Sequence, residues 1–230
     1  MRLGYLVPTL FFGAFAALGF FLAHRKAKKV KFFQQEELEV GQVTQAAVCK
    51  VHGVVATPQP IIAPFSGKPC AWYAVLVQEY VQAGRYSRWQ TVHHAASGSV
   101  FQLKDRKGPG TIEIDPRGAD VKLATEGGSE DRQLLANYLQ SIGQSRLLGF
   151  GNLRANETTL EAGEKIMALG TIVQTPGGYR MQAGKSPYVI SDTDSGQIAY
   201  QENNSMYVMR FWGGLCALAA LYFAWHLVRH

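Results

Sequence analysis

Two long apolar runs lie at the ends of this chain of 230 residues, and they constrain its fold more than any other feature. The first run covers 3–23 and carries no charged residue, and the second covers 206–228. A helix rises about 1.5 Å per residue, so about 20 apolar residues cross a hydrocarbon layer of roughly 30 Å. We therefore expect two transmembrane helices, at 3–23 and 206–228, which hold one water-soluble domain, 38–205, beside a bilayer.

The net charge of +6 is concentrated at the membrane junction. Of the 23 basic residues, five lie in the segment Arg25–Lys31 of the linker 24–37, and Arg2, Arg210 and Arg229 lie at or near the edges of the two runs. The rest of the chain has 15 basic and 17 acidic residues, so the domain itself carries a slight negative net charge and is not basic. We therefore expect no nucleic-acid partner, and we expect Arg25–Lys31 to contact anionic lipid headgroups.

The basic cluster also predicts which side of the membrane the domain occupies. Lys and Arg accumulate on the cytoplasmic side, so the domain after the first run is expected in the cytoplasm, with a periplasmic or intermembrane-space location left open. Only Arg2 precedes the first run, which favours an uncleaved anchor over a signal peptide. Ala14 and Ala16 form a small-x-small pair, so cleavage also stays open.

Small residues recur on each run at helical spacing and offer a packing face for two helices. They are Gly13 and Ala17 in the first run, and Gly213, Ala217, Ala220 and Ala224 in the second. Small residues are also common in membrane spans without any packing role, so both interpretations are kept.

The domain between the runs is predicted to be β-rich, an α+β fold that closes as a barrel or a sandwich. Short apolar segments separated by Gly, Pro and Asp predict strands at 40–56, 71–82, 85–95, 99–104, 111–114, 119–123, 152–160, 165–174, 179–182 and 188–191. Gly84 is the expected turn between 71–82 and 85–95. One amphipathic helix is predicted from an N-cap at Ser129 to Gly143, packed on the sheet.

A search for chemistry leaves no catalytic, cofactor or metal site. His93 and His94 are adjacent on a predicted strand and therefore point to opposite faces, so one ion cannot bind both. Asp105 and Asp115 could pair as carboxylates, although each has the context of a turn residue. A Cys49–Cys70 disulfide is conceivable only in an oxidising compartment.

One set of residues resembles a known family. The segment Pro64-Phe-Ser-Gly67-Lys-Pro-Cys70-Ala-Trp-Tyr73 is followed by Trp89, by Phe101 to Asp105, by Asp115-Pro116, and by Glu157, Gly163 and Gly170. Together they resemble the GIDE or "beside a membrane" domain of mulan-type mitochondrial E3 ubiquitin ligases, over about residues 45–205. The resemblance implies a domain that faces the intermembrane space and recruits partners, which conflicts with the charge rule. It gives the motif residues a structural role.

The same resemblance implies ubiquitin transfer, but the family's ligases carry a RING with about eight Cys or His zinc ligands. This sequence has three cysteines and no C-x-x-C pair, so we do not expect the activity to carry over. The expected function is a membrane-anchored, non-catalytic interaction module with a protein partner. Two alternatives are an E3-like role in ubiquitin transfer, and a hydrolase that uses His94 or Asp105.

Overall fold

The computed structural model describes residues 3–33, 36–83, 86–124, 127–144, 152–192 and 195–229. The chain divides into two compact units. Met1–Gln35 and Asp194–His230 form the first, and Glu36–Thr193 form the second. Gly84, the predicted hairpin turn, and Arg85, the first residue of the predicted strand 85–95, lie outside the described residues.

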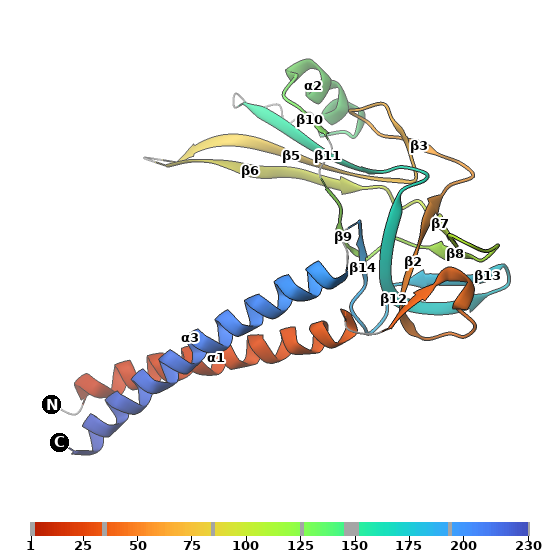
Figure 1. Cartoon of the computed structure of the whole chain (residues 1–230). Coiled ribbons are helices and arrows are strands. Elements are labelled where there is room, and N and C mark those ends of the chain that lie inside the picture. Colours follow the sequence, from red (N-terminus) through yellow and green to blue (C-terminus); the bar gives the residue numbers. More distant parts are fainter. Residues whose placement is uncertain are drawn as a thin grey trace. The chain divides into compact units, whose positions relative to one another are not determined.

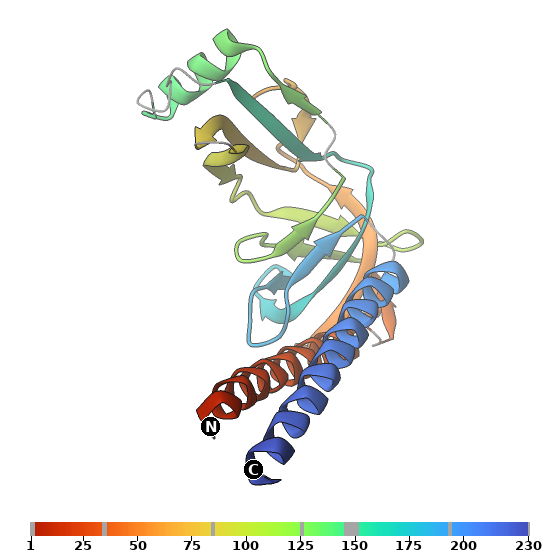
Figure 2. The same ribbon diagram turned by 90° about the vertical axis from the view of Figure 1, so that its left-hand side faces the viewer.

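The first unit is a pair of antiparallel helices, α1 (Leu3–Phe33) and α3 (Ser195–Arg229), which run side by side (Figures 1 and 2). Each contains a stretch long and apolar enough to cross a membrane, Leu6–Arg25 in α1 and Asn204–Arg229 in α3. Helix α1 continues to Phe33, so the basic cluster that we placed in a linker lies on a helix that extends beyond the apolar stretch.

Glycine brings the two helices into contact. A Cβ atom on Gly19 would lie 3.2 Å from the Cα atom of Gly213, and a Cβ on Gly213 would lie 3.6 Å from the carbonyl oxygen of Ala16. Gly213 therefore belongs to the packing face, as predicted, whereas a Cβ on Gly13 would have no neighbour within 4 Å. Further along the pair, the rings of Phe12 and Phe223 stack with centroids 5.8 Å apart.

A closed five-stranded barrel forms the centre of the second unit, which confirms the predicted β-rich fold. Its strands are β2 (Val48–Ala56), β7 (Phe101–Lys104), β8 (Thr111–Ile114), β13 (Gly178–Gln182) and β12 (Lys165–Thr175). They pair in the order β2-β7-β8-β13-β12, and β12 pairs with β2 to close the ring (Figure 1). Only β8 and β13 in this ring are parallel, a connectivity that matches the Greek-key barrel of OB-folds.

Short elements extend the barrel sheet on both sides. Strand β1 (Glu37–Glu39) runs parallel to β2, and the 3-10 turn η1 (Val40–Gln42) follows it. Strand β14 (Val189–Ser191) pairs with β12, and β9 (Asp120–Lys122) runs parallel to β14. The barrel core is apolar and includes the fully buried side chains of Phe101, Leu103, Ile112, Ile114, Ile166 and Ile172.

The insertions between the barrel strands build a second sheet. Its order is β10 (Gly127–Ser129), β11 (Leu153–Leu160), β5 (Trp72–Ala83) and β6 (Tyr86–Ala96), and all neighbours are antiparallel. Strands β5 and β6 lie between the first two barrel strands in sequence, whereas β10 and β11 lie between β8 and β12. The two-residue strands β3 (Ile61–Ile62) and β4 (Pro69–Cys70) pair with each other before β5.

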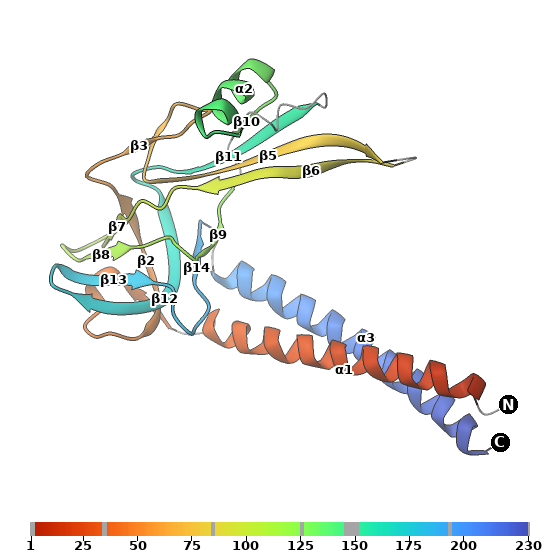
Figure 3. The same ribbon diagram turned by 180° about the vertical axis from the view of Figure 1, so that it is seen from behind.

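Helix α2 (Arg132–Ser141) covers one face of this four-stranded sheet (Figures 1 and 3). Leu135 and Leu139 are fully buried against the apolar side chains of β5 and β11. The helix begins two residues later than predicted, because Asp131 is the N-cap and accepts hydrogen bonds from the backbone N–H groups of Gln133 and Leu134. Gly143, with φ +71°, follows the helix end as expected.

Candidate binding cleft

A β-bulge in the β5–β6 hairpin determines which side chains face α2. Val77 is opposite His93, whereas Gln78 is opposite Thr91, so Val92 is an extra residue in β6. His93 points to the α2 side, where its Nε2 atom lies 3.4 Å from the Tyr138 hydroxyl. His94 lies opposite Leu76 on the other face. The two histidines therefore diverge, as the sequence predicts.

The face of the sheet opposite α2 opens into a cleft of about 740 Å³, which lies between this sheet and the segment that follows β8. The sheet contributes Trp72, Ala74, Leu76, His94, Ala96, Asn156 and Thr158, and the opposing segment contributes Pro116 to Val121 and Leu123. The lining is thus apolar at Trp72 and Leu76 and polar at His94, Asn156 and Thr158. A space of this size accommodates a ligand or a short peptide segment.

A cation–aromatic cluster continues the same face beyond the cleft. The guanidinium carbon of Arg154 lies 4.2 Å from the centre of the Trp89 ring, and its Nε donates a hydrogen bond of 2.9 Å to Gln78 Oε1. Tyr80 packs edge-on against Trp89, with centroids 5.3 Å apart. Sequence patterns did not predict that Arg154 lies over this ring.

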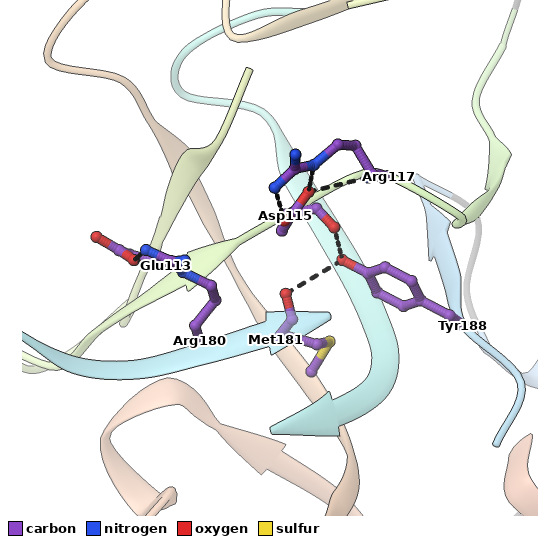
Figure 4. Close-up of polar contacts among 6 residues, drawn as sticks. All are labelled: Glu113, Asp115, Arg117, Arg180, Met181 and Tyr188. Carbon is purple, nitrogen blue, oxygen red and sulfur yellow. Dashed lines mark hydrogen bonds and ion pairs between the residues drawn. The ribbon is translucent and has the colours of Figure 1, made fainter. Parts of the chain in front are cut away.

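Asp115 fixes the loop that forms the opposite wall of the cleft (Figure 4). Its carboxylate accepts a hydrogen bond of 2.8 Å from Arg117 Nε and one of 2.6 Å from Arg117 Nη2. These bonds hold the pKa of Asp115 below its ordinary value, although burial opposes the shift. The adjacent Gly118 has φ +80°, which a side chain would disfavour.

Tyr188 connects this loop to the barrel. Its hydroxyl donates to the carbonyl oxygen of Asp115 at 2.6 Å and lies 3.4 Å from that of Met181 (Figure 4). Burial, and secondly the charge of Asp115, raise the pKa of Tyr188, so the phenol stays protonated. Beside it, Arg180 and Glu113 form an ion pair of 2.6 Å between the neighbouring strands β13 and β8. Tyr188, which directly precedes β14, thus connects the wall of the cleft to strand β13 of the barrel.

Glu157 lies on the α2 side of β11, behind the cleft, and is 2% exposed. Its two carboxylate oxygens accept hydrogen bonds from the backbone N–H groups of Phe65 and Ser66, both at 2.8 Å. The chain reverses here, and Gly67 has φ +68°. A buried carboxylate with both oxygens occupied by backbone donors is a structural group.

Asp105 has a comparable role at the turn between β7 and β8. Its carboxylate accepts hydrogen bonds from the backbone N–H groups of Gly41 and Lys107, both at 2.8 Å, and of Gly108 at 3.2 Å. These donors lower the pKa of Asp105. Each of the two aspartates thus has its own separate set of donors, and the structure does not bring Asp105 and Asp115 together as a carboxylate pair.

A comparison with protein families matches residues 76–222 to GIDE, described as E3 ubiquitin ligase. The chain belongs to the GIDE family. The match begins in β5 and ends in α3, so it covers the four-stranded sheet, the later barrel strands and part of the second apolar helix. A search of curated proteins finds no match.

The other residues that we predicted as motif residues of the family lie around the cleft and in the barrel, and those before position 76 precede the matched segment. Pro64 and Gly67 lie in the turn held by Glu157, and the backbone N–H of Tyr73 on β5 donates a hydrogen bond of 3.1 Å to Ser97 Oγ. Gly163, with φ +95°, forms the turn between β11 and β12. Phe101 is buried in the barrel, Pro116 is buried in the cleft wall, and Gly170 on β12 lies against Tyr188.

The cysteines of this GIDE protein are free thiols. Cys70 is completely buried on β4 rather than on a long central strand, and its Sγ lies 3.6 Å from the carbonyl oxygen of Ile61. Burial, followed by the charges of Glu157 and Glu161, raises its pKa to about 11. Burial also raises the pKa of Cys49 on β2. Neither thiol has the depressed pKa of a nucleophile.

Within the described ranges, no three His, Cys, Asp or Glu side chains lie close enough together to hold a metal ion. Sequence reasoning also missed the cleft, because Leu76, Asn156 and Gly118 become neighbours only through strand pairing. Arg154 was missed for the same reason. Alternation along β11, with Leu153 and Ala155 buried and Arg154 between them, was the available signal that Arg154 faces away from α2.

Proposed function

We propose that the β-rich domain is a non-catalytic binding module, held beside a bilayer by α1 and α3, whose partner is a protein. The proposal rests on one observation: the buried or turn carboxylates of the domain are hydrogen-bonded within the domain, whereas other polar side chains line an open cleft. Asp105, Asp115 and Glu157 are occupied by donors of the domain itself, whereas the cleft face presents the polar side chains of His94, Asn156 and Thr158. Carboxylates that are hydrogen-bonded in this way stabilise the loops around a binding surface and are not available for catalysis.

Photo-crosslinking in intact cells tests the partner. Benzoylphenylalanine replaces, one at a time, the exposed apolar residues Ile62, Tyr80, Tyr86, Val100 and Ile142 of the domain. We expect a discrete protein adduct from at least one of these positions. Leu218, which is exposed on α3, serves as the control for neighbours that are merely in the same membrane. Absence of adducts from all five domain positions would refute the proposal.

The alternative is a role in ubiquitin transfer, which the description of the GIDE family favours. We expect no such activity, because transfer by the family's ligases depends on the zinc ligands of a RING, and the three cysteines here are Cys49, Cys70 and Cys216. The purified full chain, with and without zinc, is added to a ubiquitin-conjugating enzyme charged with ubiquitin. Faster discharge than with buffer alone would establish the alternative.

We also propose that the domain faces the cytoplasm and that the basic cluster contacts anionic headgroups. The support is the position of the cluster on α1, immediately after the stretch Leu6–Arg25. Lys and Arg within about 15–20 residues of a span resist translocation. The intermembrane-space side implied by the mulan-type ligases is the competing outcome, and thiol labelling separates the two.

A further inference from the structure

We propose that the cleft and the Arg154 cluster form one continuous binding site for an extended peptide that carries an apolar side chain and a carboxylate. This inference rests on the proposed function and names the chemistry of the partner segment. The apolar side chain would occupy the cleft at Leu76, and the carboxylate would bind Arg154.

The position of Arg154 connects the two parts of the site. Thr158 and Asn156 line the cleft, and Arg154 is the next residue of β11 on the same face. Two residues of a strand span about 7 Å, so Arg154 lies one side-chain repeat beyond the cleft. A ligand in extended conformation, with the same repeat, therefore reaches both parts.

Arg154 is arranged to receive an anion. Its guanidinium stacks on the Trp89 ring, with Cζ 4.2 Å from the ring centre, and its Nε–H donates to Gln78 Oε1. Its two Nη groups make no hydrogen bond or ion pair with another described residue. A guanidinium fixed in this way loses little freedom when it binds a carboxylate through two parallel hydrogen bonds.

Arg154 is the basic residue of this face that has no carboxylate partner among the described residues. Arg117 is already paired with Asp115, and Asp120 lies 3.9 Å from Lys122. The face is therefore complementary to an acidic ligand rather than to a basic one.

The polar groups of the cleft favour a peptide over a lipid chain. The side chains of His94, Asn156 and Thr158 line the cleft without a hydrogen bond to another described residue. An acyl chain would bury these groups and leave them unpaired, which costs free energy. A peptide backbone carries a donor and an acceptor at each residue and can pair with them.

The experiment selects ligands with the full chain in detergent. A phage-displayed library of random heptapeptides is screened, and the enriched peptide is synthesised in an acidic form and in a form with Asn or Gln in place of its Asp or Glu. Fluorescence anisotropy measures the Kd of both. We expect the enriched peptides to carry an apolar and an acidic residue, and the acidic form to bind the wild type at least tenfold more tightly than the amide form.

Three variants assign the contact. Arg154→Gln should bind the acidic peptide at least tenfold more weakly than the wild type and should not distinguish it from the amide form. Arg88→Gln is the matched control, because Arg88 is an exposed arginine on β6 adjacent to Trp89 and therefore on the opposite face. Arg154→Lys keeps the positive charge but lacks the two parallel N–H donors of the guanidinium, so we expect a Kd between those of the wild type and Arg154→Gln. This variant also tests the contact if Arg154→Gln folds poorly.

Several results would overturn the proposal. They are a library that enriches no acidic peptide, a Kd for Arg154→Gln within twofold of the wild type, and equal losses for Arg88→Gln. Binding to phosphatidylserine vesicles that depends on Arg154, without peptide binding, would assign the site to lipid instead. Crosslinks from Ile62 or Ile142 but not from Tyr80 would refute this site and leave the proposed function intact.

Discussion

Glu157 shows how one side chain of a strand fixes a loop that lies 92 positions earlier in the sequence. The buried carboxylate accepts one hydrogen bond from the N–H group of Phe65 and one from that of Ser66. We expect Glu157→Gln to lower the free energy of unfolding by about 1–3 kcal/mol, because the amide NH₂ group faces a donor and leaves it unpaired. Denaturant unfolding of the full chain in detergent, followed by tryptophan fluorescence, measures this change.

Glu161→Gln is the control for that measurement. Glu161 pairs with Lys68 at 2.8 Å, and both side chains are partly exposed. An exposed ion pair contributes about 0–1 kcal/mol, so the control should be nearly neutral. Equal effects of the two substitutions would contradict the structural role of Glu157.

Asp115 predicts a dependence of stability on pH. Its pKa is lowered in the folded domain, mainly by Arg117, so the folded state favours the ionised form. That contribution is complete above the ordinary pKa of an aspartate, about 3.9, and is lost as the pH falls further, through the lowered folded value. Asp115→Asn should therefore lose less stability than the wild type between pH 5 and the acid limit of folding. Parallel unfolding curves for the two proteins would contradict this.

At the residue level, the sequence predicts what depends on neighbouring positions and misses what depends on strand pairing. The opposite directions of His93 and His94 follow from alternation, and the turn at Gly67 follows from local chemistry. The hydrogen bond from Gly41 to Asp105 does not, because Gly41 becomes the neighbour of Asp105 only after the barrel has formed.

At the scale of the elements, the packing of β12 against its neighbours requires a glycine at position 170. A Cβ atom on Gly170 would lie 2.6 Å from Tyr188 Cδ2 and 2.9 Å from Met181 Cγ. Both neighbours are buried, so the clash requires the core to move. We expect Gly170→Ala to lower the free energy of unfolding by about 1–3 kcal/mol. Gly177→Ala, where a Cβ meets no atom within 4 Å, is the control and should be close to neutral.

The helix pair allows a test by crosslinking. Phe12 and Phe223 stack across α1 and α3, so cysteines at these two positions should react with a short bifunctional thiol reagent. Gly213→Leu should abolish the crosslink, because a large side chain cannot fit against the backbone of Ala16 and Gly19. Gly13→Leu should preserve it, because that glycine has no close neighbour. Efficient crosslinking in Gly213→Leu would refute the packing.

The positions of the elements were more predictable than their pairing. Apolar alternation and turn residues located β5, β8 and β12 to within a residue or two. The closure of β12 onto β2 was not predictable, since residues far apart in sequence form that pair. Strand β10, with the sequence GGS, has no apolar pattern at all and was missed. Helix α2 was predicted with its N-cap misplaced at Ser129, whose hydroxyl accepts instead from the N–H of Asp131.

On the scale of the whole molecule, thiol labelling decides which side of the membrane the domain occupies. In a Cys216→Ala background, Glu130→Cys reports on the domain and Val228→Cys reports on the far end of α3. Cys49 and Cys70 are buried thiols with raised pKa values, and they should stay silent while the domain is folded. A membrane-impermeant maleimide added to intact cells should label Val228→Cys and not Glu130→Cys. The reverse pattern would contradict the cytoplasmic location.

The interleaved order of the strands determines when the domain can fold during its synthesis. The barrel is complete only when β12 and β13 have left the ribosome, and the four-stranded sheet needs β11 from late in the chain. By then α1, which is made first, has already left the ribosome. The β5–β6 hairpin of the half-made domain therefore has no β11 to pair with until that late strand has been made. Nascent chains that stop before Lys165 should be degraded rather than accumulate as a smaller folded core.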